Sequence, residues 1–77
     1  MLELIRQNLS EMLSVDPSEI TMDTRFVEDL GVDSLDMVEL IQNLEEEYNV
    51  EFDAEDMSEL KTVGEVISYL QDKGIQD

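Results

Sequence analysis

The sequence predicts a single all-α domain, and three observations support that prediction. Apolar residues recur every three or four positions in three segments, as they do along one face of an α-helix. Residue types that cap helices stand at the starts of the later segments. No stretch of useful length alternates apolar and polar residues as a half-exposed strand does. The 77 residues suffice for one small domain, which we assign to residues 1–77.

The first predicted helix spans about residues 2–13. Its apolar stripe, on one side of a helical wheel at about 100° per residue, consists of Leu2, Ile5, Leu9, Met12 and Leu13. A short helical turn is predicted at residues 16–19, because Asp16 is suited to cap it and Pro17 to open it. We therefore expect this helix to pack on a core, with the turn inside the loop that follows.

Residues 20–30 show no clear period and are predicted to form a long first loop. Its apolar residues Phe26, Val27 and Leu30 are expected to pin the loop onto the core. Gly31 permits a sharp turn before the next helix.

The central helix is predicted to begin near Asp33 and to end near Asn49. Asp33 is suited to the N-cap, and Asp36, three residues later, can complete a capping box. The stripe expected to be buried consists of Met37, Leu40, Ile41, Leu44 and Tyr48.

Two apolar residues of this helix, Leu35 and Val38, lie outside the buried stripe. On the helical wheel they are surrounded by Glu39, Gln42, Glu45 and Glu46. An exposed apolar pair ringed by carboxylates is suited to docking basic partner proteins. The alternative is two solitary surface hydrophobes, which are common on globular proteins.

Two more helices are predicted near the C-terminus. A short third helix follows Asp53 and ends near Leu60, and it has the least apolar surface to hold it in place. It is therefore the natural gate if the core opens to admit an apolar chain. The final helix begins at a second capping box, formed by Thr62 and Glu65, and Gly74 is its natural stop.

Composition and charge exclude several classes of function. Four Lys and Arg against 21 Asp and Glu give a net charge of −17, which excludes binding to a nucleic-acid backbone and disfavours an anionic membrane surface. The longest apolar run is two residues, so we expect no membrane span and no signal peptide, and a cytoplasmic location. Without Cys or His the chain can form no disulfide, thiolate nucleophile, Cys/His zinc site or His-based triad.

An EF-hand calcium loop is also excluded. That loop needs acidic ligands at its first, third and fifth positions, Gly at the sixth and Glu at the twelfth. Counting from Asp29 places Gly31 third and Ser34 sixth, and counting from Asp53 places Ser58 sixth.

Ser34 is the first residue of the predicted central helix. Its hydroxyl is expected to project into solvent beside free backbone N–H groups, which at a helix start can hold a phosphate ester. Because the chain has no His to take its proton, Ser34 is a candidate for modification and not a catalytic nucleophile. The alternative is that Ser34 is an ordinary helix-start serine.

The segment from Asp29 to Leu40, which reads DLGVDSLDMVEL, closely resembles the attachment motif of acyl carrier proteins. The likeness extends upstream through residues 26–28 and downstream through residues 44–48, and the start of the last helix at residues 61–66 also fits. The resemblance therefore covers nearly the whole chain, and is closest to the free-standing bacterial-type carriers of fatty acid synthesis.

This resemblance implies a four-helix bundle with a short third helix and a long first loop. It implies that Ser34 carries 4′-phosphopantetheine, transferred from coenzyme A by a phosphopantetheinyl transferase that uses a divalent metal. The thiol of this arm carries acyl groups as thioesters, so a chain without Cys or His obtains its reactive sulfur from a cofactor. The positions where the family's second helix meets partner enzymes are Asp33, Leu35, Asp36, Val38, Glu39 and Glu45.

The predicted function is that of a non-catalytic, monomeric carrier, with no catalytic residue and no metal site of its own, that delivers acyl groups to the enzymes of fatty acid biosynthesis. Its expected partners are the transferase and basic-surfaced enzymes, namely acyltransferase, ketosynthase, reductases and dehydratase. The alternatives are a carrier of polyketide or aminoacyl cargo and an unmodified acidic helical interaction module.

Three positions depart from the family pattern. Gln42 stands where the docking face often has an apolar residue, so docking is expected to be less hydrophobic. Asp53 stands where Pro is common before the third helix, which is expected to loosen that junction. Lys61 is a charged substitution just ahead of the last helix. None of the three touches the attachment motif.

Overall fold

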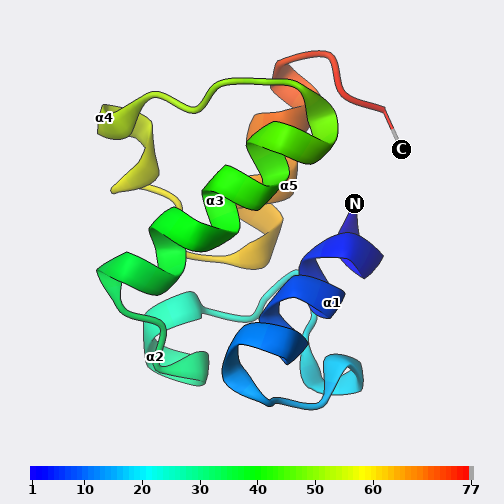
Figure 1. The fold of residues 1–77 in the computed structure, drawn as a ribbon, viewed down its shortest axis with the longest axis vertical. Coiled ribbons are helices and arrows are strands. Elements are labelled where there is room, and N and C mark those ends of the chain that lie inside the picture. Colours follow the sequence, from blue (N-terminus) through cyan, green and yellow to red (C-terminus); the bar gives the residue numbers. More distant parts are fainter. Residues whose placement is uncertain (77) are drawn as a thin grey trace.

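Five α-helices and one 3₁₀ turn make up residues 1–76, the part of the chain that the computed structural model describes (Figure 1). In chain order they are α1 (Leu2–Leu13), the 3₁₀ turn η1 (Pro17–Glu19), α2 (Phe26–Leu30), α3 (Ser34–Tyr48), α4 (Ala54–Met57) and α5 (Val63–Asp72). The only β-type pairing within these residues is an isolated bridge between Arg25 and Thr62. The predicted all-α fold is confirmed. The predicted short third helix is α4, which ends at Met57, earlier than predicted.

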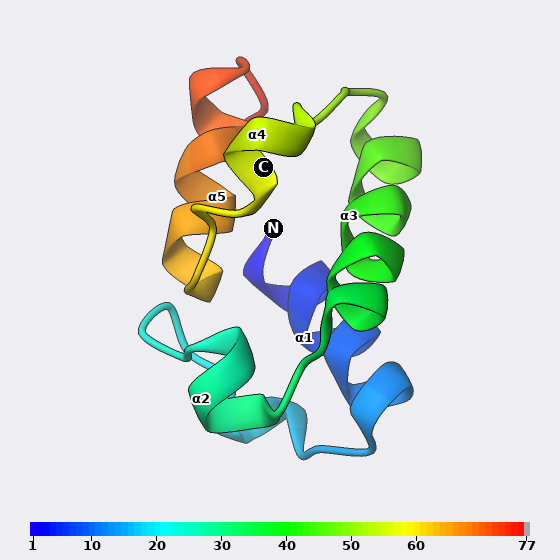
Figure 2. The ribbon, with the colours of Figure 1, turned by 90° about the vertical axis from the view of Figure 1, so that its left-hand side faces the viewer.

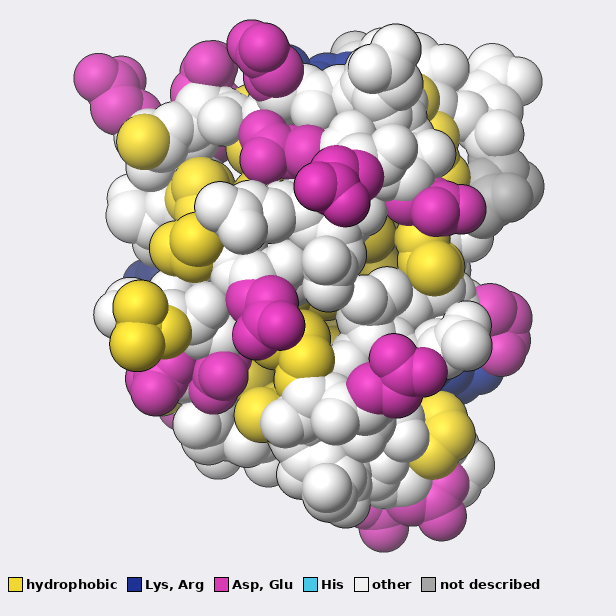
Figure 3. All heavy atoms as spheres, viewed as in Figure 1, with side chains coloured by type: hydrophobic (Ala, Val, Ile, Leu, Met, Phe, Trp, Pro, Cys, Tyr) yellow, Lys and Arg dark blue, Asp and Glu magenta, His cyan; other side chains and the backbone are white. Residues whose placement is uncertain are grey.

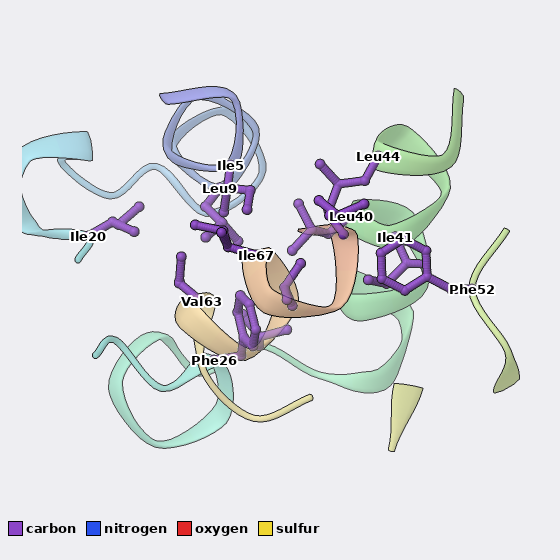
Figure 4. Close-up of a cluster of buried hydrophobic side chains, with 13 residues drawn as sticks. Ile5, Leu9, Ile20, Phe26, Leu40, Ile41, Leu44, Phe52, Val63 and Ile67 are labelled. Atoms are coloured by element: carbon purple, nitrogen blue, oxygen red, sulfur yellow. The ribbon is translucent and has the colours of Figure 1, made fainter. Parts of the chain in front are cut away.

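The core lies between α1, α3 and α5. Figure 2 shows α3 and α5 on opposite sides of the molecule, with α4 across the space between them. The predicted stripes of α1 and α3 face inward, as do the apolar residues of α5, and Ile20, Val32 and Phe52 from the loops complete the core (Figure 4). The buried apolar residues are Ile5, Leu9, Ile20, Phe26, Val32, Leu40, Ile41, Leu44, Phe52, Val63, Val66, Ile67 and Leu70.

The long first loop contains a short helix, α2, that the sequence analysis did not predict. Phe26 is buried and Leu30 is half-buried, as expected, but Val27 is 67% exposed. The prediction that Val27 pins the loop to the core is therefore wrong. Neighbouring residues on a helix point about 100° apart, so a helix that buries Phe26 and Leu30 turns Val27 outward.

Backbone hydrogen bonds fix the long loop to the start of α5. The Val63 N–H donates to the Thr24 carbonyl (3.0 Å), and the Gly64 N–H donates to the Met22 carbonyl (2.8 Å). A Cβ added at Gly64 would lie 2.9 Å from that same Met22 oxygen, so a larger residue would push the loop away. This attachment sets where α2, and the segment after it, lie on the bundle.

The last helix begins and ends as its sequence predicts. The Thr62 hydroxyl accepts from the Glu65 N–H (3.1 Å), and the Glu65 carboxylate accepts from the Thr62 N–H (3.0 Å), which completes the capping box. After the helix, Gly74 adopts a left-handed conformation (φ 90°), and the Ile75 N–H donates to the Leu70 carbonyl (3.1 Å). This is the pattern of a Schellman C-terminal motif.

The charge of the fold is largely unpaired, because 21 acidic side chains face only four basic ones. Arg6 pairs with Glu3, and Arg25 pairs with Glu28 and Asp29. Repulsion among the remaining carboxylates acts across several neighbours at once, since the Debye length is about 10 Å at 0.1 M salt.

We therefore expect added salt to stabilise the folded state at pH 7. Thermal melts are compared in low salt, in added NaCl and in millimolar Mg²⁺ or Ca²⁺. A gain of about 1 kcal/mol would raise the melting temperature by about 4–8 °C in a domain of this size, with the divalent cations more effective than NaCl. A midpoint that does not change among these conditions would contradict the electrostatic argument.

Candidate cofactor attachment site

Ser34 is an exposed residue at the start of α3, and the chain before it is held in place. Gly31 ends α2 in a left-handed conformation (φ 67°), and its N–H donates to the Val27 carbonyl (3.0 Å). Val32 is buried, and its N–H donates to the Phe26 carbonyl (2.9 Å). The chain thus turns at Gly31 and is anchored at Val32, two residues before Ser34.

Asp33 and Asp36 fix the first turn of α3 through the predicted capping box. The Asp33 Oδ1 accepts from the Asp36 N–H (2.8 Å), and the Asp36 Oδ2 accepts from the Asp33 N–H (3.3 Å). Both carboxylates also lie at the positive end of the helix dipole, which stabilises them there. They hold the backbone that presents Ser34.

The Ser34 hydroxyl makes no hydrogen bond to another part of residues 1–76, and the N–H groups of Ser34 and Leu35 have no acceptor there. Free N–H groups at a helix start bind phosphate oxygens. The nearby carboxylates of Asp33 and Asp36 repel a free anion, but a covalent bond to the serine overcomes that repulsion. The site therefore fits a phosphate ester attached to Ser34.

The motif begins at Asp29, which the structure assigns to α2. The Arg25 backbone N–H donates to the Asp29 carboxylate (2.8 Å), and the Arg25 guanidinium donates to it as well (3.0 Å). The guanidinium bond, and after it the backbone bond, hold the pKa of Asp29 below its ordinary value, and the guanidinium bond also raises the pKa of Arg25. Asp29 thus stabilises the short helix that precedes the attachment turn.

The exposed apolar pair predicted on the central helix is confirmed. Leu35 is 77% exposed and Val38 is 41% exposed, and the neighbouring Glu39 and Gln42 are also exposed. Figure 3 shows the face of the molecule on which α3 lies in Figure 1, with carboxylates spread between apolar side chains and little Lys or Arg in view. We call Leu35, Val38, Glu39 and Gln42 the α3 face.

Comparison with known proteins decides the family. Residues 3–70 match the family model described as a phosphopantetheine attachment site. The chain belongs to the acyl carrier proteins. It is 46% identical over 70 residues to the acyl carrier protein of Bdellovibrio bacteriovorus, covering 91% of this chain and 90% of that one. It is 47% identical over 70 residues to the acyl carrier protein of Clostridium perfringens, covering 91% and 92%.

A solved structure agrees with the sequence comparison. A protein from Mycobacterium tuberculosis assigned as an acyl carrier protein superposes with a TM-score of 0.82 at 34% identity, covering 91% of this chain and 93% of that one. The resemblance found from the sequence is thus confirmed, as are the acyl-carrier fold and 4′-phosphopantetheine as the cofactor of the family. Membership of this family implies a carrier of acyl groups.

Glu45 is a third predicted docking residue with a role within the fold, besides Asp33 and Asp36 of the capping box. Glu45 is half-buried, and its carboxylate accepts from the Phe52 N–H (2.8 Å), which ties the segment after α3 back to that helix. A helical wheel gives the direction of a side chain but not its partner, so this bond had no signal in the sequence. Glu45 is less available to a partner than Glu39.

One exposed apolar residue close to the motif was assigned to the core by the sequence analysis. Val27 lies on α2, the helix that ends at the Gly31 turn, and its side chain is nearly as exposed as that of Leu35. The sequence did contain a signal for this exposure. Phe26 and Val27 are adjacent, and a helix cannot bury two adjacent residues on one narrow face.

Residues 1–76 contain neither a metal-binding cluster nor a membrane-spanning helix. Nowhere in that range do three or more Asp, Glu, His or Cys side chains form a group able to hold a metal ion. Within the same range, no helix combines the length and the apolar character needed to cross a membrane.

Proposed function

We propose that this protein carries acyl groups on 4′-phosphopantetheine attached to Ser34 and delivers them to the enzymes of fatty acid biosynthesis. The observation that carries the proposal is the exposed, unpartnered Ser34 hydroxyl on a capped helix start, in a chain of the acyl carrier family. We assign residues 1–77 to one acyl carrier domain that acts as a monomer in the cytoplasm.

The chain's own residues present the hydroxyl and do not activate it. Loading forms a bond between the Ser34 oxygen and the phosphorus of the arm while the pyrophosphate bond of coenzyme A breaks. The adenosine half of coenzyme A leaves as adenosine 3′,5′-bisphosphate, and the hydroxyl proton has to leave to a base. The chain has no His, and the Asp33 and Asp36 carboxylates are occupied in the capping box, so the base belongs to the transferase. Once bound, the cofactor supplies a thiol that holds an acyl group as a thioester.

The α3 face is the proposed surface for the partner enzymes. Leu35 directly follows the loaded serine, and Val38 and Glu39 lie one turn further along the same helix. Negative charge around an apolar pair steers a basic partner to this end of the molecule and sets the register of docking. The partners we propose are phosphopantetheinyl transferase and basic-surfaced acyltransferase, ketosynthase, reductases and dehydratase.

Incubation with coenzyme A, Mg²⁺ and a phosphopantetheinyl transferase tests this function. We expect the intact mass to rise by one phosphopantetheine arm and by no more. No rise in mass, in a reaction where a known carrier is loaded, would favour the unmodified interaction module instead. Thioester cargo released from the protein in cells is expected to be fatty acyl; polyketide or aminoacyl cargo would contradict the assignment to fatty acid biosynthesis.

A further inference from the structure

α4 is held more weakly by packing than the other helices. It has only four residues, and it alone among the five α-helices of residues 1–76 has no buried residue. Half-buried Met57 is its apolar contact with the core, and half-buried Leu60 adds one just after the helix. A single helical turn with so little buried surface is not stable by itself, so other interactions must keep it across the space between α3 and α5 (Figure 2).

Tyr69 of α5 supplies such interactions through a single hydroxyl. The hydroxyl donates to the Asp56 Oδ2 (2.8 Å) and accepts from the Asp53 N–H (3.3 Å). The Tyr69 ring stacks on Phe52, with centroids 4.7 Å apart and planes 25° apart, and the Lys73 ammonium lies 5.0 Å from the ring centroid. Tyr69 therefore contacts three points of the segment: Phe52, Asp53 at the junction before α4, and Asp56 within α4.

The hydrogen bond between the residue 53 N–H and the Tyr69 hydroxyl requires a residue other than proline, because proline has no backbone N–H. Asp53, which stands where Pro is common, was expected from the sequence to loosen the junction. The structure adds a contact that this expectation did not include, because the Asp53 N–H forms a hydrogen bond to Tyr69 that proline could not form.

We propose that Tyr69 is a latch that holds α4 closed, and that its release lets residues 53–60 open as one unit. Both hydrogen bonds end on one oxygen, so a single movement of the Tyr69 side chain breaks them together. The ring of Phe52, which adjoins α4, is directed toward Ile41 of α3 in Figure 4. Opening therefore gives an apolar chain a route to the core; use of that route by acyl cargo rests on the proposed function, whereas the latch itself does not.

Amide hydrogen exchange on the unloaded protein tests the latch. Tyr69→Phe keeps the stacked ring and removes both hydroxyl hydrogen bonds. We expect exchange of the amides in residues 54–60 to become faster by on the order of tenfold, while the amides of α1 and α3 keep their wild-type rates. The matched control is Tyr48→Phe, which removes a tyrosine hydroxyl from α3 and is expected to leave residues 54–60 unchanged.

A second pair of variants tests the same latch from α4. Asp56→Ala removes the acceptor of the Tyr69 hydroxyl, and Glu55→Ala removes the same charge from the neighbouring position. We expect faster exchange in residues 54–60 for Asp56→Ala and not for Glu55→Ala. This comparison still decides the question if Tyr69→Phe does not fold.

Three results would overturn the latch. They are wild-type exchange of residues 54–60 in Tyr69→Phe, an equal acceleration of α1, α3 and α4, and identical effects of Asp56→Ala and Glu55→Ala. None of these results depends on the cofactor, so failure of the latch is distinct from failure of loading at Ser34.

Discussion

The Ser34→Ala variant is expected to accept no phosphopantetheine arm while keeping its fold. The variant removes the hydroxyl oxygen to which we propose the arm is attached. Ser34 is an exposed first-turn residue whose side chain makes no hydrogen bond within residues 1–76. The change in stability should stay within about 0.5 kcal/mol. Intact mass after incubation with coenzyme A and transferase measures loading, and thermal melting measures the fold.

The other serines provide the controls. Ser58→Ala and Ser68→Ala remove exposed hydroxyls from other parts of the surface and are expected to load as the wild type does. The serines that lack the flanking motif are Ser10, Ser14, Ser18, Ser58 and Ser68. One full equivalent of arm on the folded Ser34→Ala protein would disprove the assignment.

Charge reversal on the α3 face is expected to slow partner enzymes. Glu39→Lys replaces an exposed carboxylate close to Ser34 with a cation, so a basic enzyme loses attraction and meets repulsion. Val38→Asp removes an apolar contact from the same face. We expect each variant to lower kcat/KM for loading by about tenfold at low ionic strength, and the Glu39→Lys effect to shrink as salt is added.

The matched control for this surface is Glu47→Lys. It makes the same charge change on the same helix, but Glu47 lies toward α1, where a shallow groove also contains Leu4, Asn8 and Glu11. We expect Glu47→Lys to load at close to the wild-type rate. Glu45→Lys is a poor probe, since it also breaks the bond to the Phe52 N–H. Normal loading and elongation with Glu39→Lys and Val38→Asp would mean that the docking surface is placed wrongly.

The features predicted correctly from the sequence are those that depend on near neighbours along the chain. The stripe of α1 and the capping boxes at Asp33 and Thr62 involve residues three or four positions apart, so periodicity and cap chemistry reveal them. The exposed position of Ser34 followed from its place after an N-cap. The motif around it then identified the family.

The features missed from the sequence depend on tertiary partners. The five-residue helix α2 is too short for a period and is stabilised by burial of Phe26 and by the Arg25–Asp29 bonds. Asp53 was expected to loosen a junction, but its N–H reaches Tyr69, sixteen positions along the chain. No local pattern contains that information.

Fragment mass spectrometry of the loaded wild-type protein tests the central claim most directly. The protein is loaded from coenzyme A, digested and fragmented so that the modified residue is read from the masses of the fragments. The account predicts a single modified peptide with the arm on Ser34, between Asp33 and Leu35. An arm on any other residue, or a transferase-treated protein in which the Asp29–Leu40 segment keeps its unmodified mass, would contradict it.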